Sequence, residues 1–213
     1  VGEKSYEEYR RLREAGADRY LLRFETSNAV LYEKLRPQCT LASRVRCLLW
    51  LKALGYQVGS GCMIGLPGQT MEMLVDDLYF IRDLDLDMVG VGPFIPHPAT
   101  PLGDSEPVDF GVVLRFVALL RILTRNAHIP ATTAMGSVHP FGRQMALLRG
   151  ANILMPNLTP KRFRKDYEIY PHKICLMENP GDCSECTEGM ILSLGRIVGT
   201  GAGHSLKLKD IAR

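Results

Sequence analysis

The sequence predicts an α/β fold that corresponds to the C-terminal part, about five βα units, of a (β/α)8 (TIM) barrel. Three observations lead to this prediction. Five strand-like segments alternate with helix-like segments, which is typical of a parallel sheet covered by helices. Polar Arg23 and Glu25 share one face of an otherwise apolar strand, as they would at a barrel mouth. The sequence has no glycine fingerprint of the kind that opens a dinucleotide-binding, doubly wound sheet.

Capping residues and changes of hydrophobic period mark the elements of the first half. Thr40 and Thr70 are each placed to cap a helix, and in the segment RYLLRFET the apolar Leu22 and Phe24 fall on one face of a strand. The expected elements are a helix over 5–15, a strand over 19–26, a helix over 40–54, a strand over 56–64 and a helix over 70–85.

The alternation continues in the second half. Asp109 is placed to cap a long helix, and Thr159 with Pro160 forms a favoured helix start. The expected elements are a strand over 87–94, a helix over 109–124, a strand over 129–135, a helix over 140–149, a strand over 151–155, a helix from 159 and a helix over 187–197. The glycine-rich tail GTGAGHSLKLKDIAR is expected to be mobile. We divide the chain into a partial barrel (1–170) and a C-terminal extension (171–213).

Five strands cannot close a TIM barrel, and a complete barrel needs about 250 residues. This chain has 213 residues and begins with Val1 in a helix-like stretch. We therefore expect about three βα units to precede Val1 in a parent protein.

Composition excludes several classes of protein. With 26 Lys and Arg against 23 Asp and Glu, the net charge of +3 does not favour a polybasic nucleic-acid binder. No apolar run approaches the roughly 18 residues of a membrane span, and the N-terminal stretch has no apolar signal-peptide core. Six cysteines are too few for a secreted disulfide scaffold of this length. We expect a cytoplasmic protein that binds neither nucleic acid nor membrane.

Candidate ligand-binding residues follow or end the predicted strands. Arg23 and Glu25 form either a structural ion pair inside the barrel or part of a ligand site, since buried charges are costly unless they are paired or used. Thr132 and Thr133 either bind an anion through their hydroxyls or are ordinary β-branched strand formers.

Other candidates have weaker signals. Met88 and Met155 lie on predicted strands, where core packing is the usual role of methionine. Arg44 stands at a helix start, against the helix dipole, which indicates either a bound carboxylate or a surface arginine. The turn GLPGQT is a possible anion-binding turn or a plain strand–helix connection, and it lacks the lysine of a Walker A loop.

The strongest local motif is Cys175-x7-Cys183-x2-Cys186. Three thiolates from one segment can bind a metal or an iron–sulfur cluster, although zinc normally takes four ligands. The alternative is three unused thiols.

Taken together, the motifs LLRFETS, RVRCLLWLKALGYQVGSGCMIGLPGQT, DMVGVGPFIPHPATPL, IPATTAMG and ANILMPNLTP closely resemble the HydE family of radical S-adenosylmethionine (SAM) enzymes, which mature [FeFe]-hydrogenase. The resemblance covers residues 16–196. It implies a TIM barrel in which a 4Fe–4S cluster cleaves SAM to a 5′-deoxyadenosyl radical. That radical acts on an iron–carbonyl–cyanide–cysteine precursor, an organometallic, amino-acid-derived small molecule, and other hydrogenase maturation proteins are the implied partners.

The resemblance also implies roles for individual residues. The implied SAM-binding residues are Glu25, Ser27, Arg44, Gly65 and Leu66. The implied substrate-binding residues are Arg23, Met88, Thr132, Thr133, Met155 and Tyr167. Cys175, Cys183 and Cys186 match the ligands of a second, peripheral iron–sulfur cluster.

The chain departs from the family in one essential respect, because it has no CxxxCxxC motif to hold the catalytic cluster. We therefore name no catalytic residue and expect the chain alone to be inactive in SAM cleavage. The alternatives are an enzyme like methylornithine synthase or biotin synthase, and a non-catalytic iron–sulfur module.

Overall fold

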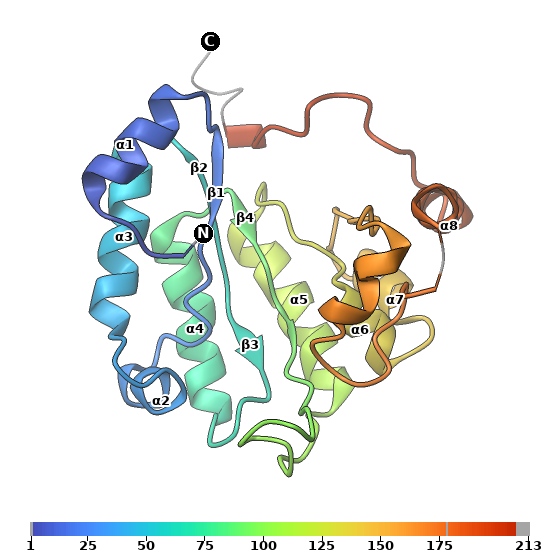
Figure 1. Cartoon of the computed structure of the whole chain (residues 1–213), viewed down its shortest axis with the longest axis horizontal. Coiled ribbons are helices and arrows are strands. Elements are labelled where there is room, and N and C mark those ends of the chain that lie inside the picture. Colours follow the sequence, from blue (N-terminus) through green and yellow to red (C-terminus); the bar gives the residue numbers. More distant parts are fainter. Residues whose placement is uncertain (1, 178, 208–213) are drawn as a thin grey trace.

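The computed structural model describes residues 2–177 and 179–207 of the chain. Short parallel strands alternate with helices, as expected (Figure 1). The strands are β1 (Arg19–Leu21), β2 (Gln57–Ser60), β3 (Met63–Ile64), β4 (Met88–Val89) and β5 (Gly92–Pro93). The helices are α1 (Tyr6–Glu14), α2 (Ala29–Leu35), α3 (Leu41–Ala53), α4 (Met71–Leu84), α5 (Phe110–Thr124), α6 (Thr133–Val138), α7 (Gly142–Leu148), α8 (Pro180–Ser193) and the 3-10 helix η1 (Lys161–Tyr167). None of the described helices is long and apolar enough to cross a membrane.

The strands form one array of parallel segments in chain order. β2 pairs with β1 on one side and β4 on the other, and β3 pairs with β5. Single parallel bridges extend the array: Glu25 to Cys62, Met88 to His128, and Pro130 to Ile153. The fourth and fifth predicted strands therefore take their expected places, although each is reduced to bridge contacts. The order and direction confirm the predicted βα alternation.

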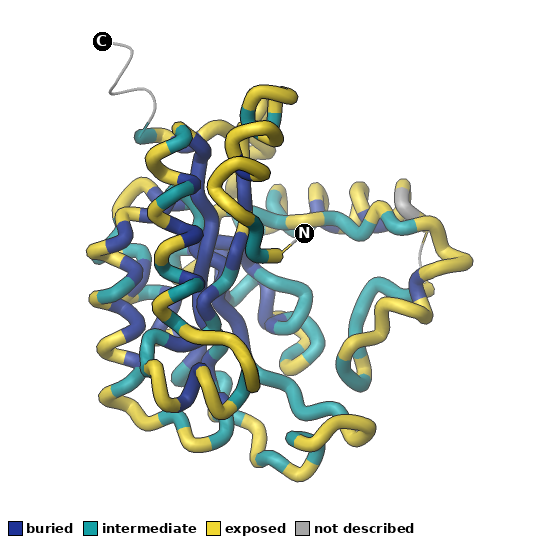
Figure 2. Tube along the Cα trace, turned by 60° about the vertical axis from the view of Figure 1, so that its left-hand side comes forward, coloured by how far each residue is buried: buried dark blue, intermediate teal, exposed yellow. Residues whose placement is uncertain are grey.

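The two faces of the array differ sharply. Leu22 and Phe24 are 3% and 0% exposed, because they pack under the helices that cover the outer face. Leu21, on the opposite face, is 55% exposed. Figure 2 shows the buried strands covered on one side by half-exposed helices. Within the described residues β1 pairs with β2 alone, so the array is open at the β1 edge.

Helix starts in the first half follow the capping residues read from the sequence. The side chain of Thr40 accepts a hydrogen bond from the N–H of Ser43 (3.2 Å), and Thr70 caps α4 in the same way. Asp109 accepts the N–H of Gly111 at 2.9 Å and begins α5. The predicted positions of α3, α4 and α5 are thereby confirmed.

The predicted strand over 129–135 is wrong in its second half. Thr132 is the N-cap residue of α6, which begins at Thr133. Threonine favours both strands and N-caps, and the β-branched pair was interpreted as strand. Met135, which was predicted at the end of the strand, lies on α6, and its side chain is fully buried.

Three further helices differ from expectation. α8 begins at Pro180, seven residues before the predicted start at 187, because Asn179 and Asp182 form a capping box. Cys183 and Cys186 therefore lie on a helix and not in a loop. The helix predicted from residue 159 is the 3-10 helix η1, and α2, capped by Asn28, was not predicted.

The tail is held to the sheet over its described part. The N–H of Ser205 donates to Oε1 of Gln57 at 2.7 Å, and Arg19 donates to the carbonyl of Ala202 at 2.6 Å. The described part of the tail therefore crosses the amino-terminal ends of the strands and is hydrogen-bonded to them, whereas the sequence predicted a mobile tail. Residues 208–213 lie outside the described residues.

Candidate active site

An arginine–glutamate pair lies at the carboxyl end of the first strand. Arg23 Nη2 is 3.2 Å from Glu25 Oε2 and donates to the carbonyl of Cys62 at 2.6 Å. The Glu25 side chain is 13% exposed, and its other oxygen lies 3.5 Å from Arg36. Glu25 has a φ of +68°, an unfavourable value for a residue with a side chain. Such strain concentrates at ligand sites, where the surrounding structure enforces it.

Several buried polar atoms at this end of the strands have no hydrogen-bond partner among the described residues. They are Nε of Arg23, Oγ of Ser27 and Oγ1 of Thr132, and Oε2 of Glu25 has only its 3.2 Å ion pair with Arg23. Buried polar atoms are nearly always hydrogen-bonded, because an unsatisfied one costs about 1–3 kcal/mol. These atoms are donors and acceptors of the kind that a polar or charged ligand would satisfy.

The strand register brings Thr132 to the same edge as Glu25. Glu25 pairs with Cys62, and the next residue on that strand, Met63, pairs with Gly92. A Cβ atom at Gly92 would lie 2.9 Å from Oγ1 of Thr132, so glycine leaves this hydroxyl uncovered. The ion pair and the threonine hydroxyl therefore stand at one level, the pair at the end of the first strand and the hydroxyl where α6 begins after the fourth.

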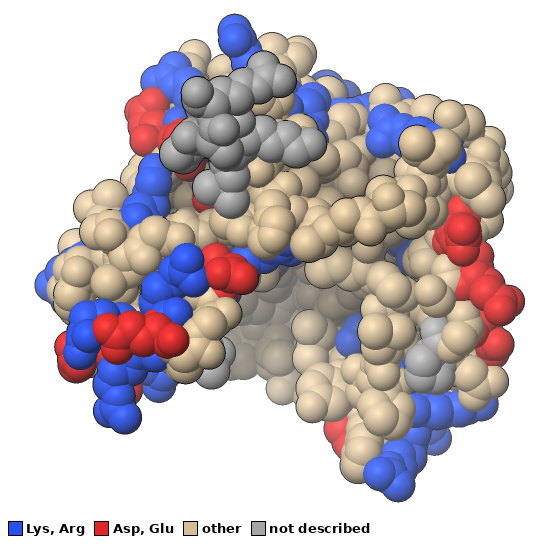
Figure 3. Space-filling view, turned by 90° about the horizontal axis from the view of Figure 1, so that it is seen from above, with Lys and Arg blue, Asp and Glu red and all other residues tan. Residues whose placement is uncertain are grey.

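Two cavities lie along the inner face. One, of about 410 Å³, extends toward the amino-terminal ends of the strands, because Arg19 and Gln57 line it together with Met88 and Met155. The other, of about 230 Å³, is lined by residues that include Thr133, Met155 and Tyr167. Met155 belongs to both, so four predicted substrate-binding residues line adjoining spaces. Figure 3, which views the amino-terminal end of the strands, shows the molecule hollowed between its two sides.

Other predicted SAM-binding groups are already occupied within the protein. Arg44 is buried; its Nε lies 2.8 Å from Oε1 of Glu3, and its Nη1 donates to the carbonyl of Arg23 at 3.0 Å. A SAM carboxylate at Arg44 would have to displace or share the Glu3 contact. The N–H groups of Gly65 and Leu66 both donate to Oε1 of Gln69, at 2.8 and 3.2 Å.

A buried carboxylate on α4 lies beneath these turns, and the sequence analysis did not identify it as part of the site. Oδ1 of Asp77 accepts the N–H of Ser27 at 2.6 Å, and Oδ2 accepts Nε2 of Gln69 at 3.3 Å. Burial raises the pKa of the Asp77 carboxyl to about 6. The helical spacing of Leu74, Leu78 and Ile81, which places residue 77 on the same inward face, is the signal that could have revealed it.

The three cysteines do not form a metal site in this structure. No group of three or more His, Cys, Asp or Glu side chains among the described residues is arranged to hold a metal ion. Cys183 is buried and its sulfur accepts the N–H of Asn157 at 3.1 Å, whereas Cys186 is exposed one turn further along α8. The geometry therefore does not support the predicted second cluster.

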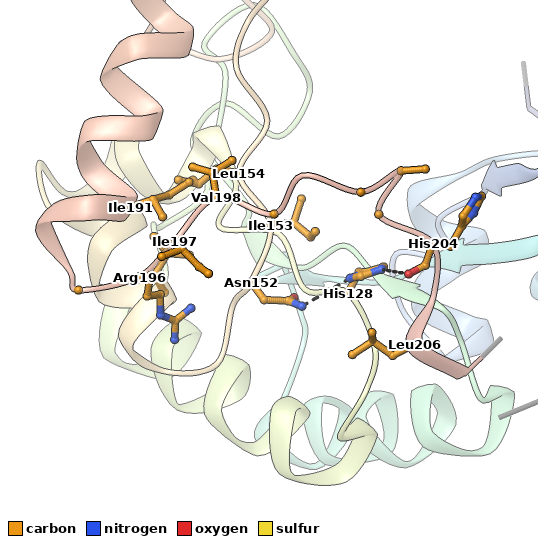
Figure 4. A pocket seen from close by; sticks show the side chains of 16 residues that line it. His128, Asn152, Ile153, Leu154, Ile191, Arg196, Ile197, Val198, His204 and Leu206 are labelled. Atoms are coloured by element: carbon orange, nitrogen blue, oxygen red, sulfur yellow. Dashed lines mark hydrogen bonds between the residues drawn. The ribbon is translucent and has the colours of Figure 1, made fainter. Parts of the chain in front are cut away.

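A separate cavity of about 990 Å³ lies at the opposite end of the strands, between the tail and α8 (Figure 4). Its polar wall is a chain of contacts: Nδ2 of Asn152 approaches Nδ1 of His128 (3.5 Å), and His128 Nε2 approaches the carbonyl of His204 (3.2 Å). Its remaining wall is largely apolar, with Ile191 and Val198. In parallel α/β barrels this end serves stability, and the carboxyl end serves chemistry.

Residues 2–81 match the family model of the radical SAM superfamily. The chain is 54% identical over 196 residues to the [FeFe] hydrogenase maturase subunit HydE of Thermotoga maritima, covering 92% of this chain and 56% of that protein. It is 32% identical over 142 residues to 3-methylornithine synthase of Methanosarcina acetivorans, covering 67% of this chain and 40% of that protein. The chain spans about half the length of the HydE relative.

Solved structures show the same fold. The crystal structure of methylornithine synthase (PylB) matches with a TM-score of 0.75 at 25% identity, covering 93% of this chain and 57% of that chain. The structure of HydG, a maturase of the [FeFe]-hydrogenase, matches with a TM-score of 0.75 at 15% identity, covering 100% of this chain and 48% of that one. The second likeness bears on the fold alone. Together they confirm a partial (β/α)8 barrel.

Proposed function

The chain belongs to the HydE family of the radical SAM superfamily, and on this basis we propose that its strand ends form part of the SAM and substrate chamber of an enzyme that matures [FeFe]-hydrogenase. The observation that carries the proposal is the set of unpartnered buried polar atoms at the carboxyl edge of the strands. They lie at the end of the barrel where TIM-barrel enzymes place their chemistry, and Thr133, next to Thr132, lines a cavity of about 230 Å³.

The residues present fit SAM on the side of the first strand. The carboxylate of Glu25, whose Oε2 makes only the 3.2 Å ion pair with Arg23, and the hydroxyl of Ser27 are suited to the hydroxyl and ammonium groups of SAM. When bound beside a reducing 4Fe–4S cluster, SAM supplies a 5′-deoxyadenosyl radical. The cysteines of this chain do not form a CxxxCxxC motif, so the ligands of that cluster would come from outside these 213 residues.

The substrate side is cationic and polar at one end and apolar along its walls. Nε of Arg23 and the hydroxyl of Thr132 are donors for the carboxylate of an iron–carbonyl–cyanide–cysteine precursor. Met88 and Met155 line the wall of the cavity and would exclude water from a reactive radical. The chain's own contribution is to orient the anionic group and keep the chamber dry.

Ligand binding by the 213-residue chain tests this proposal. Isothermal titration calorimetry with S-adenosylhomocysteine, which cannot be cleaved to a radical, should show binding that Glu25→Gln weakens by about tenfold, the loss of one charge-assisted hydrogen bond. Glu33→Gln, an exposed change of the same kind on α2, is the matched control and should leave the affinity unchanged.

A second measurement addresses the missing cluster motif. After anaerobic reconstitution with iron, sulfide and a reductant, the chain alone should form no 5′-deoxyadenosine from SAM. Absence of S-adenosylhomocysteine binding, or equal affinity in the Glu25 and Glu33 variants, would refute the proposed SAM site. SAM cleavage by the isolated chain would refute the view that the cluster ligands lie outside it.

A further inference from the structure

Two turns that follow neighbouring strands converge on one buried helix. The first turn, Glu25–Ser27, follows β1, and the second, Gly65–Gln69, follows β3. The first contains Glu25 and Ser27, which we propose to bind SAM, and the second contains Gly65 and Leu66, which the family resemblance assigns to SAM. The present inference therefore rests on the proposed function. The strand ladder reaches Glu25, whose carbonyl accepts the N–H of Met63 at 2.9 Å. Ser27 and the turn Gly65–Gln69 lie beyond the described ladder hydrogen bonds between these two segments, so the ladder does not fix their separation directly.

Asp77 connects the two turns through both of its carboxylate oxygens. Oδ1 accepts the backbone N–H of Ser27 at 2.6 Å, and Oδ2 accepts Nε2 of Gln69 at 3.3 Å. Gln69 in turn accepts the N–H groups of Gly65 and Leu66. Gln69 Nε2 also donates to the carbonyl of Met63 at 3.1 Å, which fixes the orientation of its amide.

The residue at position 77 lies in an unfavourable place for a charge. Asp77 is fully buried on the inward face of α4, between Leu74 and Leu78. The titratable groups that interact electrostatically with it are the exposed Asp76 on its own helix and the buried thiol of Cys62 on the facing strand. The described contacts include no cation at Asp77, so its charge depends on the Ser27 and Gln69 hydrogen bonds. An apolar residue would pack there at lower cost.

We propose that Asp77 is a positioning residue that joins the turn after β1 and the turn after β3 into one unit, so that the two halves of the proposed SAM site keep a fixed separation. Asp77 contacts no ligand in this scheme. It acts through the backbone N–H of Ser27 and the side chain of Gln69. Loss of the link should loosen both turns together, including Gly65 and Leu66, which Asp77 does not touch.

The geometry suggests a variant that breaks the link and a second that restores it. In Asp77→Asn the single amide oxygen can still accept the Ser27 N–H, but the amide nitrogen then faces Nε2 of Gln69, donor against donor. Adding Gln69→Glu supplies an acceptor for that nitrogen and keeps an oxygen for Gly65 and Leu66. It also removes the amide donor to the Met63 carbonyl, so the restoration is partial. Asp76→Asn is the matched control, because it removes the same charge one residue away at an exposed position.

Amide hydrogen exchange of the 213-residue chain, followed by NMR, measures the link without any ligand. We expect Gly65 and Leu66 to exchange about tenfold faster in Asp77→Asn and at the wild-type rate in Asp76→Asn. In the Asp77→Asn, Gln69→Glu double variant they should exchange at a rate between those of Asp77→Asn and wild type. Titration with S-adenosylhomocysteine should show the same order of affinities across the four proteins.

The outcomes separate this inference from the function on which it rests. Unchanged exchange of Gly65 and Leu66 in Asp77→Asn would overturn the link, whatever the ligand does. If exchange is faster in Asp77→Asn and the double variant does not slow it, the link is also overturned, because the substitution would then have loosened the surrounding structure as a whole. Faster, restorable exchange in a chain that does not bind S-adenosylhomocysteine would confirm the link and overturn the proposed SAM site.

Discussion

Replacement of Gly61 by alanine should be among the most destabilising single changes in this chain. Gly61 lies between β2 and β3, with a φ of +148° that favours glycine. A Cβ atom there would lie 2.0 Å from the carbonyl oxygen and 2.7 Å from the carbonyl carbon of Gly90 on the neighbouring strand. Ordinary carbon–oxygen contacts are about 3.3 Å, so the strands would have to separate by about 1.3 Å.

That separation has a calculable cost. It would break the hydrogen bond from Gly90 N–H to the Ser60 carbonyl (2.8 Å) and weaken the two that the Gly61 carbonyl accepts from Phe24 and Glu25. At about 1 kcal/mol for each bond, with a further 1–2 kcal/mol for the backbone conformation, Gly61→Ala should cost about 3–5 kcal/mol. This is a large share of the 5–15 kcal/mol that typically stabilises a domain.

Equilibrium urea unfolding followed by circular dichroism measures this cost. The matched control is Gly68→Ala, because Gly68 also has a positive φ (+84°) but no atom within 4 Å of the added Cβ. The control should lose only the conformational cost of about 1–2 kcal/mol. If Gly61→Ala loses no more stability than Gly68→Ala, the close approach of Gly61 to Gly90 does not constrain the sheet.

Three further predictions concern other parts of the molecule. Because burial raises the pKa of Asp77 to about 6, above its unfolded value near 3.9, this residue favours folding below pH 4 and loses that contribution as the pH rises through 6. The unfolding free energy of Asp77→Asn relative to wild type should therefore rise by up to about 3 kcal/mol between pH 4 and pH 7, and a flat difference would contradict the burial. Gln57→Ala removes the acceptor of the Ser205 N–H and should cost about 1–2 kcal/mol, with faster amide exchange confined to residues 199–207. Cys183→Ala should lower the free energy of unfolding by about 1–2 kcal/mol and Cys186→Ala by less than about 0.5 kcal/mol; equal, iron-dependent losses would instead indicate a cluster.

Local signals predicted the first part of the fold well, because they act within a few residues. Thr40 and Thr70 cap their helices as their positions indicate, and the alternation of Leu22 and Arg23 places one under the helices and the other on the inner face. Prediction failed where one residue type serves two local structures. Thr132 was interpreted as strand and is a helix cap, since threonine favours both.

The residues of the candidate site were likewise predictable where the signal is local and not where it spans the sequence. Arg23 and Glu25 could be identified from one strand, because polar groups on an apolar strand are conspicuous. Asp77 could not be identified as readily, because its partner Ser27 is fifty residues away in the sequence. Cysteine spacing alone did not predict the arrangement of the thiols, because Cys183 and Cys186 lie on α8, which begins seven residues before the predicted start.

The contrast between Glu25, which the sequence revealed, and Asp77, which it did not, reflects one property of the molecule. Within the sheet, the level at which Glu25 meets its neighbours is fixed by backbone alone, through glycines such as Gly61 that let strands approach closely. Beyond the last strand bond no such constraint exists, and the turns need a side chain to hold them. A buried carboxylate suits this task because its two oxygens can accept from two different segments, as an apolar side chain cannot. Ionised Asp77 lowers stability above pH 6. Its role in positioning the turns therefore explains a carboxylate at this buried site better than any contribution to the stability of α4 does.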